Sequence, residues 1–170
     1  NLYQPGWVTE GLAVYFESDL TGTGRVAGTY ERMIAESTAR SGGLLGIDRW
    51  SLATSRYPDG DIPYGYGALF LDYLARTRGA PSIGKFVETS SGTTIPFRLD
   101  HMARQGFGTT FSHAWREWRD SVGRRAEPAR APLAGWRDLT HDGRLADYPR
   151  WATDSSLVYP ASNGRQSLSL

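Results

Sequence analysis

The sequence predicts a mainly α-helical protein with a short β segment at its C-terminal end. Apolar residues recur at helical spacing through most of residues 1–126. A proline- and alanine-rich stretch at 127–135 interrupts this pattern and is typical of a linker. Residues 136–170 then carry an Asn-Gly turn signal followed by alternating polar and apolar residues. We therefore expect a helical domain, a linker and the beginning of a β region.

Two helices are expected in the first 40 residues. Residues 7–20 are apolar around most of the circumference of a helix, which indicates a buried helix. Pro5-Gly6 precedes it and a Thr-Gly-Thr-Gly run at 21–24 ends it. A second helix is expected over 25–40. Four of its apolar side chains are expected to point inward: Val26, Tyr30, Met33 and Ile34.

Four more helices are expected after a loop-rich stretch at 44–63. The strongest pattern covers 66–78, with Gly79 as the expected C-cap. Pro81 suits the first turn of the next helix. The last three helices are expected over 81–89, 96–104 and 111–122.

Composition excludes several classes of protein and site. The chain has 39% hydrophobic and 12% aromatic residues, as ordinary soluble globular proteins do. Its net charge of +1 gives no bias toward nucleic acid. There is no cysteine, which excludes disulfides, thiolate zinc sites and cysteine nucleophiles. No apolar run approaches the roughly 20 residues that span a bilayer, so we expect no membrane insertion.

Glu10 is the most informative position for chemistry. It is predicted to lie in the first turn of an apolar helix, and Glu17 follows two turns along the same face. Burial of an isolated carboxylate is costly unless it is paired, hydrogen-bonded or bound to a cation. A helix N-terminus would also stabilise Glu10, through the macrodipole and free backbone N–H groups. From the residues alone both interpretations stay open.

Residues 5–15, PGWVTEGLAVY, resemble the W-x-x-E-G-x-A-x-Y helix of gluzincin zinc metallopeptidases, the peptidase MA-like group that includes aminopeptidase N-like enzymes. The resemblance implies the helical half of a thermolysin-like catalytic domain. In that family the motif's glutamate is the third zinc ligand beside two histidines, which makes Glu10 the expected Zn²⁺ ligand. Gly11 would allow a neighbouring backbone to approach closely, and Trp7 would line one side of the site. Glu17 carries no assigned family role.

Residues 62–71, IPYGYGALFL, resemble the P-Y-x-K-G segment of the same family. There the tyrosine hydroxyl donates to the oxyanion of the tetrahedral intermediate, which makes Tyr64 the expected catalytic residue. A phenol suits this role because it is a neutral donor at pH 7. The sequence departs from the pattern at Tyr66, where lysine is common. The alternative is that both tyrosines only pack at the start of a helix.

The family also has an H-E-x-x-H helix, which provides two zinc ligands and the general base. It would lie N-terminal to Glu10, whereas the three histidines here are downstream and are expected to be surface or structural residues: His101, His113 and His141. Both ends of the sequence read like interior sequence. We therefore expect a longer parent protein whose N-terminal half of the catalytic domain carries that helix. This chain alone is not expected to bind catalytic zinc tightly or to hydrolyse peptides.

Residues 149–156, PRWATDSS, resemble the turn before the inner strands of TolB-type β-propellers. The resemblance implies that residues 136–170 begin an incomplete propeller, because several blades are needed to bury its faces. A peptidase followed by a propeller is similar to exported bacterial enzymes acting on peptides or proteins. The alternative is a non-catalytic helical binding or spacer module on the same scaffold. An H-E-x-x-H motif upstream in the parent protein would favour the peptidase, and its absence would favour the binding or spacer module.

Overall fold

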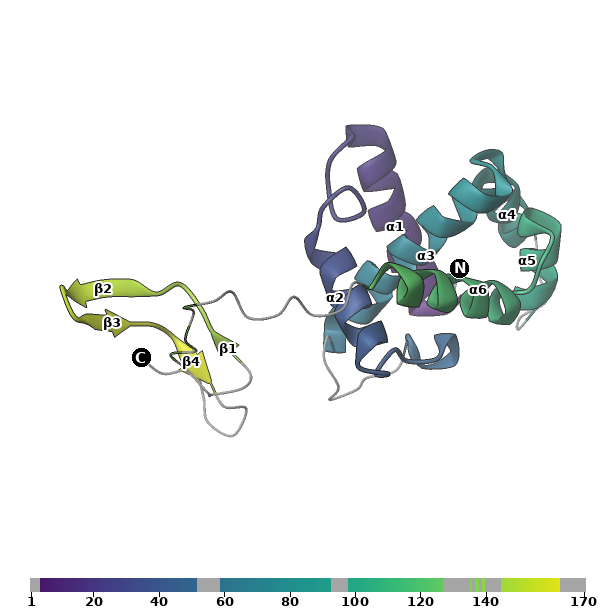
Figure 1. The fold of residues 1–170 in the computed structure, drawn as a ribbon. Helices are drawn as coiled ribbons and strands as arrows, with labels where there is room; N and C mark the ends of the chain where they lie inside the picture. The colour runs from purple at the N-terminus through teal and green to yellow at the C-terminus, as the bar shows by residue number, and fades with distance from the viewer. Residues whose placement is uncertain are drawn as a thin grey trace. The chain divides into compact units, whose positions relative to one another are not determined.

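The computed structural model describes residues 4–51, 59–92, 98–126, 135, 137, 139 and 145–162. The chain divides into two compact units, Asn1–Pro128 and Ala129–Leu170, which are described separately. The first unit is helical and the second contains short antiparallel strands (Figure 1). The prediction of a mainly α-helical chain with a short β segment is therefore confirmed. No helix within the described ranges is long and apolar enough to cross a membrane.

The helical unit contains the elements labelled in Figure 1. Its helices are α1 (Gly6–Thr21), α2 (Tyr30–Arg40), α3 (Ile62–Arg78), α4 (Pro81–Gly92), α5 (Leu99–Phe107) and α6 (Phe111–Arg125). Single 3₁₀ turns are η1 (Ile47–Arg49) and η2 (Asp59–Asp61). A helix ends cleanly where glycine takes up a left-handed conformation: Gly22 follows α1 with φ 68°, and Gly108 follows α5 with φ 71°.

Helices α1 and α3 lie side by side at backbone contact distance (Figure 1). The contact is made by Gly11 of α1 and Gly67 of α3. A Cβ atom at Gly67 would lie 2.6 Å from the carbonyl oxygen of Trp7, and one at Gly11 would lie 2.7 Å from the carbonyl carbon of Gly67. No real Cβ atom approaches backbone so closely, so the two glycines determine how near the helices come.

An aromatic cluster around Trp50 forms the centre of the helical core. Trp50 is fully buried, and its ring lies edge-on to Trp7 (5.6 Å between ring centroids), Phe70 (5.7 Å) and Trp118 (5.4 Å). Its indole N–H donates to the carbonyl oxygen of Leu45 at 3.0 Å, so the buried polar atom is satisfied. Because these partners come from α1, α3 and α6, the cluster fixes the three helices against one another.

Two predictions about α2 are wrong. The helix begins at Tyr30 rather than at residue 25, and Tyr30 and Met33 are exposed (55% and 57%) rather than directed inward. Residues 25–29 form a turn after Gly24, which has φ 93°, a conformation that ends helical geometry. The later start leaves a helix whose buried residues are Ile34 and Ala35. The inward position of Ile34 is confirmed.

The second unit contains two antiparallel strand pairs. Strand β1 (Leu145–Ala146) pairs with β4 (Ala161–Ser162), and β2 (Arg150–Thr153) pairs with β3 (Ser156–Val158). The segment expected to be a turn is itself the strand β2, and the turn falls at Asp154-Ser155. The expected turn at Asn163-Gly164 and most of the 127–135 linker lie outside the described residues.

Candidate functional site

Glu10 lies on α1 and is partly buried. The prediction that it lies in the first turn is wrong, because α1 begins at Gly6 and Glu10 is its fifth residue. The helix therefore has no acidic residue in its first turn, and Glu10 lies beyond the four residues whose N–H groups lack helical partners. The effect of the helix macrodipole falls off within the first turn, so the macrodipole stabilises the Glu10 carboxylate little.

The Glu10 carboxylate makes no hydrogen bond or ion pair with any described residue. Core residues flank it along α1: Trp7 and Val8, three and two residues before it, are buried, and Gly11 is the residue in contact with α3. A carboxylate at the edge of an apolar core gains stability from a cation or a donor placed against it. Glu17, two turns further along α1, is exposed.

Tyr64 lies in the first turn of α3, because that helix begins at Ile62 rather than at residue 66 as predicted. Pro63 suits this position, since its missing N–H needs no partner in the first turn. The Tyr64 side chain is 37% exposed, and its hydroxyl makes no hydrogen bond with a described residue. The guanidinium carbon of Arg25 lies over its ring, 5.7 Å from the ring centroid.

The glycine contact brings the two candidate residues onto neighbouring helices. Glu10 immediately precedes Gly11, and Tyr64 lies one turn before Gly67. The close approach expected at Gly11 from its family pattern is therefore observed, and its partner is the glycine of the second motif. The sequence placed Glu10 on one helix and Tyr64 at the start of another, but it carried no signal that the two glycines would face each other.

Tyr66, the departure from the family pattern, is a core residue. It is 2% exposed, and its ring packs against Trp50 (5.8 Å) and Trp118 (6.1 Å). Burial raises the pKa of its phenol, with a smaller opposite effect from the Thr38 side chain. Tyr66 and Tyr64 therefore differ in surroundings: Tyr66 packs as the alternative interpretation expects, whereas Tyr64 stays accessible.

Trp7, expected to line one side of the site, also lies in the core. It is 2% exposed, and its ring contacts Phe111 at 5.0 Å as well as Trp50. Its backbone N–H, which has no partner within the helix, donates a hydrogen bond to the Ser51 hydroxyl at 3.2 Å. Trp7 therefore holds the N-terminal end of α1, and with it Glu10, against α3 and α6.

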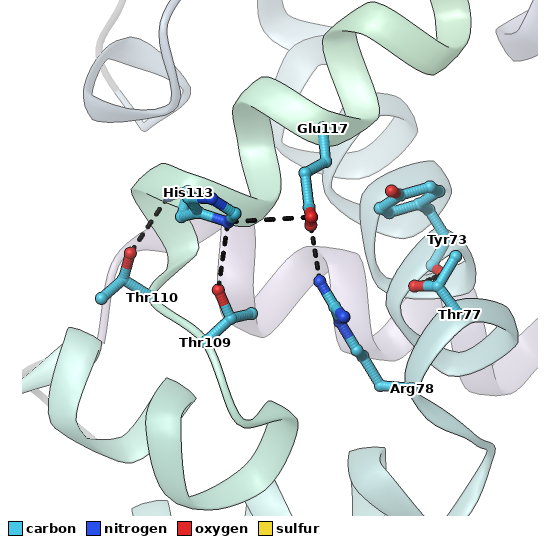
Figure 2. A network of polar contacts seen from close by, with 7 residues as sticks. All are labelled: Tyr73, Thr77, Arg78, Thr109, Thr110, His113 and Glu117. Atoms are coloured by element: carbon cyan, nitrogen blue, oxygen red, sulfur yellow. Dashed lines mark hydrogen bonds and ion pairs between the residues drawn. The ribbon is translucent and has the colours of Figure 1, made fainter.

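His113 belongs to a polar network that joins α3 to α6 (Figure 2). Arg78 donates to Glu117 at 2.6 Å, and His113 Nδ1 lies 3.8 Å from the other oxygen of Glu117 and 3.4 Å from the Thr109 hydroxyl. Both partners thus face the same ring nitrogen. A nucleophile–histidine–acid relay needs them on opposite nitrogens. The network is a surface link between the C-terminal end of α3 and α6 rather than a catalytic triad.

His101 and His141 are the other two histidines of the chain. His101 is partly buried on α5, and His141 lies outside the described residues. Among the residues that the structure describes, no group of three His, Cys, Asp or Glu side chains could hold a metal ion. Glu10 therefore does not belong to a metal-binding group within the described part of the chain.

A cleft of about 860 Å³ in the helical unit is lined by neither candidate residue. It is bounded by the C-terminal halves of α1, α3 and α6 together with α2, and neither Glu10 nor Tyr64 lines it. Its charged side chains are three arginines and three carboxylates: Arg32, Arg76, Arg125, Asp19, Glu36 and Asp72. Because these charges balance, the cleft shows no preference for a cationic or anionic ligand.

No family model, curated protein or solved structure matches the chain.

Proposed function

We propose that the helical unit is the C-terminal part of a zinc metallopeptidase domain, in which Glu10 is the third zinc ligand and Tyr64 stabilises the oxyanion. One observation carries the proposal. The Gly11–Gly67 contact places the helix of Glu10 against the helix of Tyr64, with each residue within one turn of the contact. Each has a polar group that no described residue engages.

Glu10 is the residue of this chain that would bind a zinc ion. A carboxylate is a zinc ligand in sites of the two-histidine, one-carboxylate type, and Glu10 is partly buried and unpaired among the described residues. The two histidines and the general-base glutamate would come from an upstream H-E-x-x-H helix in the parent protein. When bound, zinc would supply Lewis-acid chemistry toward the scissile carbonyl.

Tyr64 would act on the substrate directly. As the peptide carbonyl is attacked, negative charge develops on its oxygen, and the Tyr64 hydroxyl would donate a hydrogen bond to it. Such a donor accelerates the reaction because it meets charge that is present only in the transition state. The 37% exposure of Tyr64 leaves it open to a substrate, whereas the neighbouring Tyr66 at 2% is not.

The exposed face of α1 also supports a larger domain. The helix is apolar around most of its circumference, yet Phe16 is 37% exposed and Leu20 is 81% exposed. Large apolar side chains on a helix are normally covered by another part of the protein. We propose that the remainder of the catalytic domain covers this face, in an exported parent enzyme whose substrates are peptides or proteins.

Substitution of Tyr64 by phenylalanine in the full-length parent protein tests the proposed role. Removal of one oxyanion donor lowers kcat by about a hundredfold or more, so Tyr64→Phe should lower turnover of fluorogenic peptides to that extent while zinc content is kept. Tyr30→Phe, which alters an exposed tyrosine on α2, is the matched control and should leave kcat unchanged. Equal kcat for wild type and Tyr64→Phe would overturn the assignment of Tyr64, whereas a wild type with neither turnover nor zinc would favour the non-catalytic module.

A further inference from the structure

Arg25 is placed by the fold against Tyr64, although neither motif contains it. It lies in the turn between α1 and α2, and its guanidinium carbon is 5.7 Å from the centroid of the Tyr64 ring. A guanidinium within about 6 Å of an aromatic centroid is attracted by the negative face of the ring. This contact restricts the orientation of a phenol whose side chain is otherwise partly free.

Glu31 of α2 holds Arg25 in turn. Its Oε1 atom lies 3.8 Å from Arg25 Nε, and the Glu31 side chain is only 15% exposed whereas that of Arg25 is 50% exposed. A Cβ atom at Gly65, the residue after Tyr64, would lie 3.2 Å from Glu31 Cγ. Glu31 therefore packs against the backbone that carries Tyr64. The three side chains form a continuous series, from Glu31 through Arg25 to the Tyr64 ring.

We propose that Arg25, held by Glu31, is a positioning residue for Tyr64. The inference rests on the proposed function and deepens it. A hydrogen-bond donor aimed at a transition state is effective only when it is placed in advance, because reorganisation during the reaction raises the barrier. The Tyr64 hydroxyl makes no hydrogen bond with a described residue, so the cation over its ring is the contact that orients it.

A double-mutant cycle in the full-length parent protein tests this role. Arg25→Met should lower kcat by about two- to fivefold, the factor that an exposed cation–π contact supplies, with KM little changed. Arg25→Lys, which keeps a cation over the ring, should restore part of the loss. In a Tyr64→Phe background the same Arg25→Met change should have no further effect on kcat, because the hydroxyl that Arg25 positions is already absent.

Arg119 provides a matched control. Its guanidinium carbon lies 5.2 Å from the ring centroid of Trp115 on the surface of α6, so Arg119→Met removes the same kind of contact away from Tyr64. That variant should keep wild-type kcat. A loss of kcat from Arg25→Met that persists in the Tyr64→Phe background would overturn the positioning role alone. Unchanged kcat in Tyr64→Phe itself would overturn the proposed function, and the positioning role with it.

Hydroxyl-radical footprinting tests the contact itself, independently of activity. In the same full-length protein, Arg25→Met should raise the labelling of Tyr64 by uncovering one face of its ring, whereas Arg119→Met should not. Tyr148 of the second unit, 70% exposed, gives the internal reference because its labelling should stay constant. An unchanged circular dichroism spectrum shows that the variant is folded. Equal Tyr64 labelling in Arg25→Met and wild type would overturn the inference.

Discussion

Gly11 and Gly67 determine the separation of α1 and α3, so replacing either glycine by a larger residue should destabilise the protein. In Gly67→Ala the new Cβ atom would meet the Trp7 carbonyl oxygen at 2.6 Å, so the helices must move apart. We expect a loss of about 1–3 kcal/mol in the free energy of unfolding, as for other overpacked contacts. Urea denaturation followed by circular dichroism measures it.

Gly84 of α4 is the control for that substitution, because a Cβ atom there would have no neighbour within 4 Å. Gly84→Ala should be neutral or stabilising by up to about 1 kcal/mol, since alanine loses less backbone entropy than glycine in a helix. If Gly67→Ala proved as stable as Gly84→Ala, the two helices would not be in backbone contact.

The buried phenol of Tyr66 predicts how stability changes in alkali. Burial raises its pKa above the usual value of about 10. The unfolded chain therefore loses this proton at a lower pH than the folded protein does. The stabilisation is complete below about pH 10 and declines as the pH rises above it. Burial also raises the pKa values of Tyr15 and Tyr73, with the same sign.

Tyr66→Phe removes this titration. Its free energy of unfolding, measured by urea denaturation, should fall less steeply than that of the wild type above about pH 10 and run parallel to it below. Tyr30→Phe, at an exposed site, should behave like the wild type throughout. Equal alkaline slopes for Tyr66→Phe and wild type would show that the phenol titrates alike in the folded and unfolded chains.

Individual residue environments were only partly predictable from the sequence. The buried position of Ile34 follows from helical spacing, but the same spacing placed Tyr30 and Met33 inward, and both are exposed. In a helix as short as α2, periodicity identifies apolar faces without deciding which one meets the core. Arg25 gave no sequence signal at all, because its contact with Tyr64 joins a turn to a helix nearly forty positions further along.

At the scale of single helices, α6 has a side-chain cap that α2 lacks. The Thr110 hydroxyl accepts a hydrogen bond from the backbone N–H of His113 at 3.1 Å, whereas Thr29 before α2 makes no such bond. Thr110→Ala should therefore lower the free energy of unfolding by about 1 kcal/mol, while Thr29→Ala should change it little. Thermal or urea unfolding of the two variants compares them, and equal losses would contradict the capping role.

Helix boundaries were predicted well where glycine or proline marks them. The expected ends of α1 and α3 agree with the structure within one residue, and Pro81 begins α4 as expected. The start of α3 was placed four residues late, at 66 rather than Ile62, because the loop-rich pattern extends to Pro63. The two glycines after Tyr64 allow close packing: Gly65 lies against Glu31, and Gly67 lies against α1.

At the scale of the whole molecule, the apolar character of α1 predicted a buried helix, and the exposure of Phe16 and Leu20 differs from that expectation. The hydrophobic pattern of a helix indicates which of its faces are buried, but it does not identify the part of the protein that packs against them. The same holds for the site. The sequence indicated Glu10 and Tyr64 by resemblance, whereas the glycine contact that joins their helices required three-dimensional structure.

Zinc stoichiometry of the full-length parent protein tests the central claim most directly. We predict about one zinc ion per chain in the wild type, and a marked loss in Glu10→Gln, because the amide is a poor substitute for the third ligand. Glu17→Gln, at an exposed carboxylate two turns along the same helix, should keep its zinc. Zinc content that is equal in Glu10→Gln and Glu17→Gln, or zinc absent from every form, would contradict the assignment of Glu10.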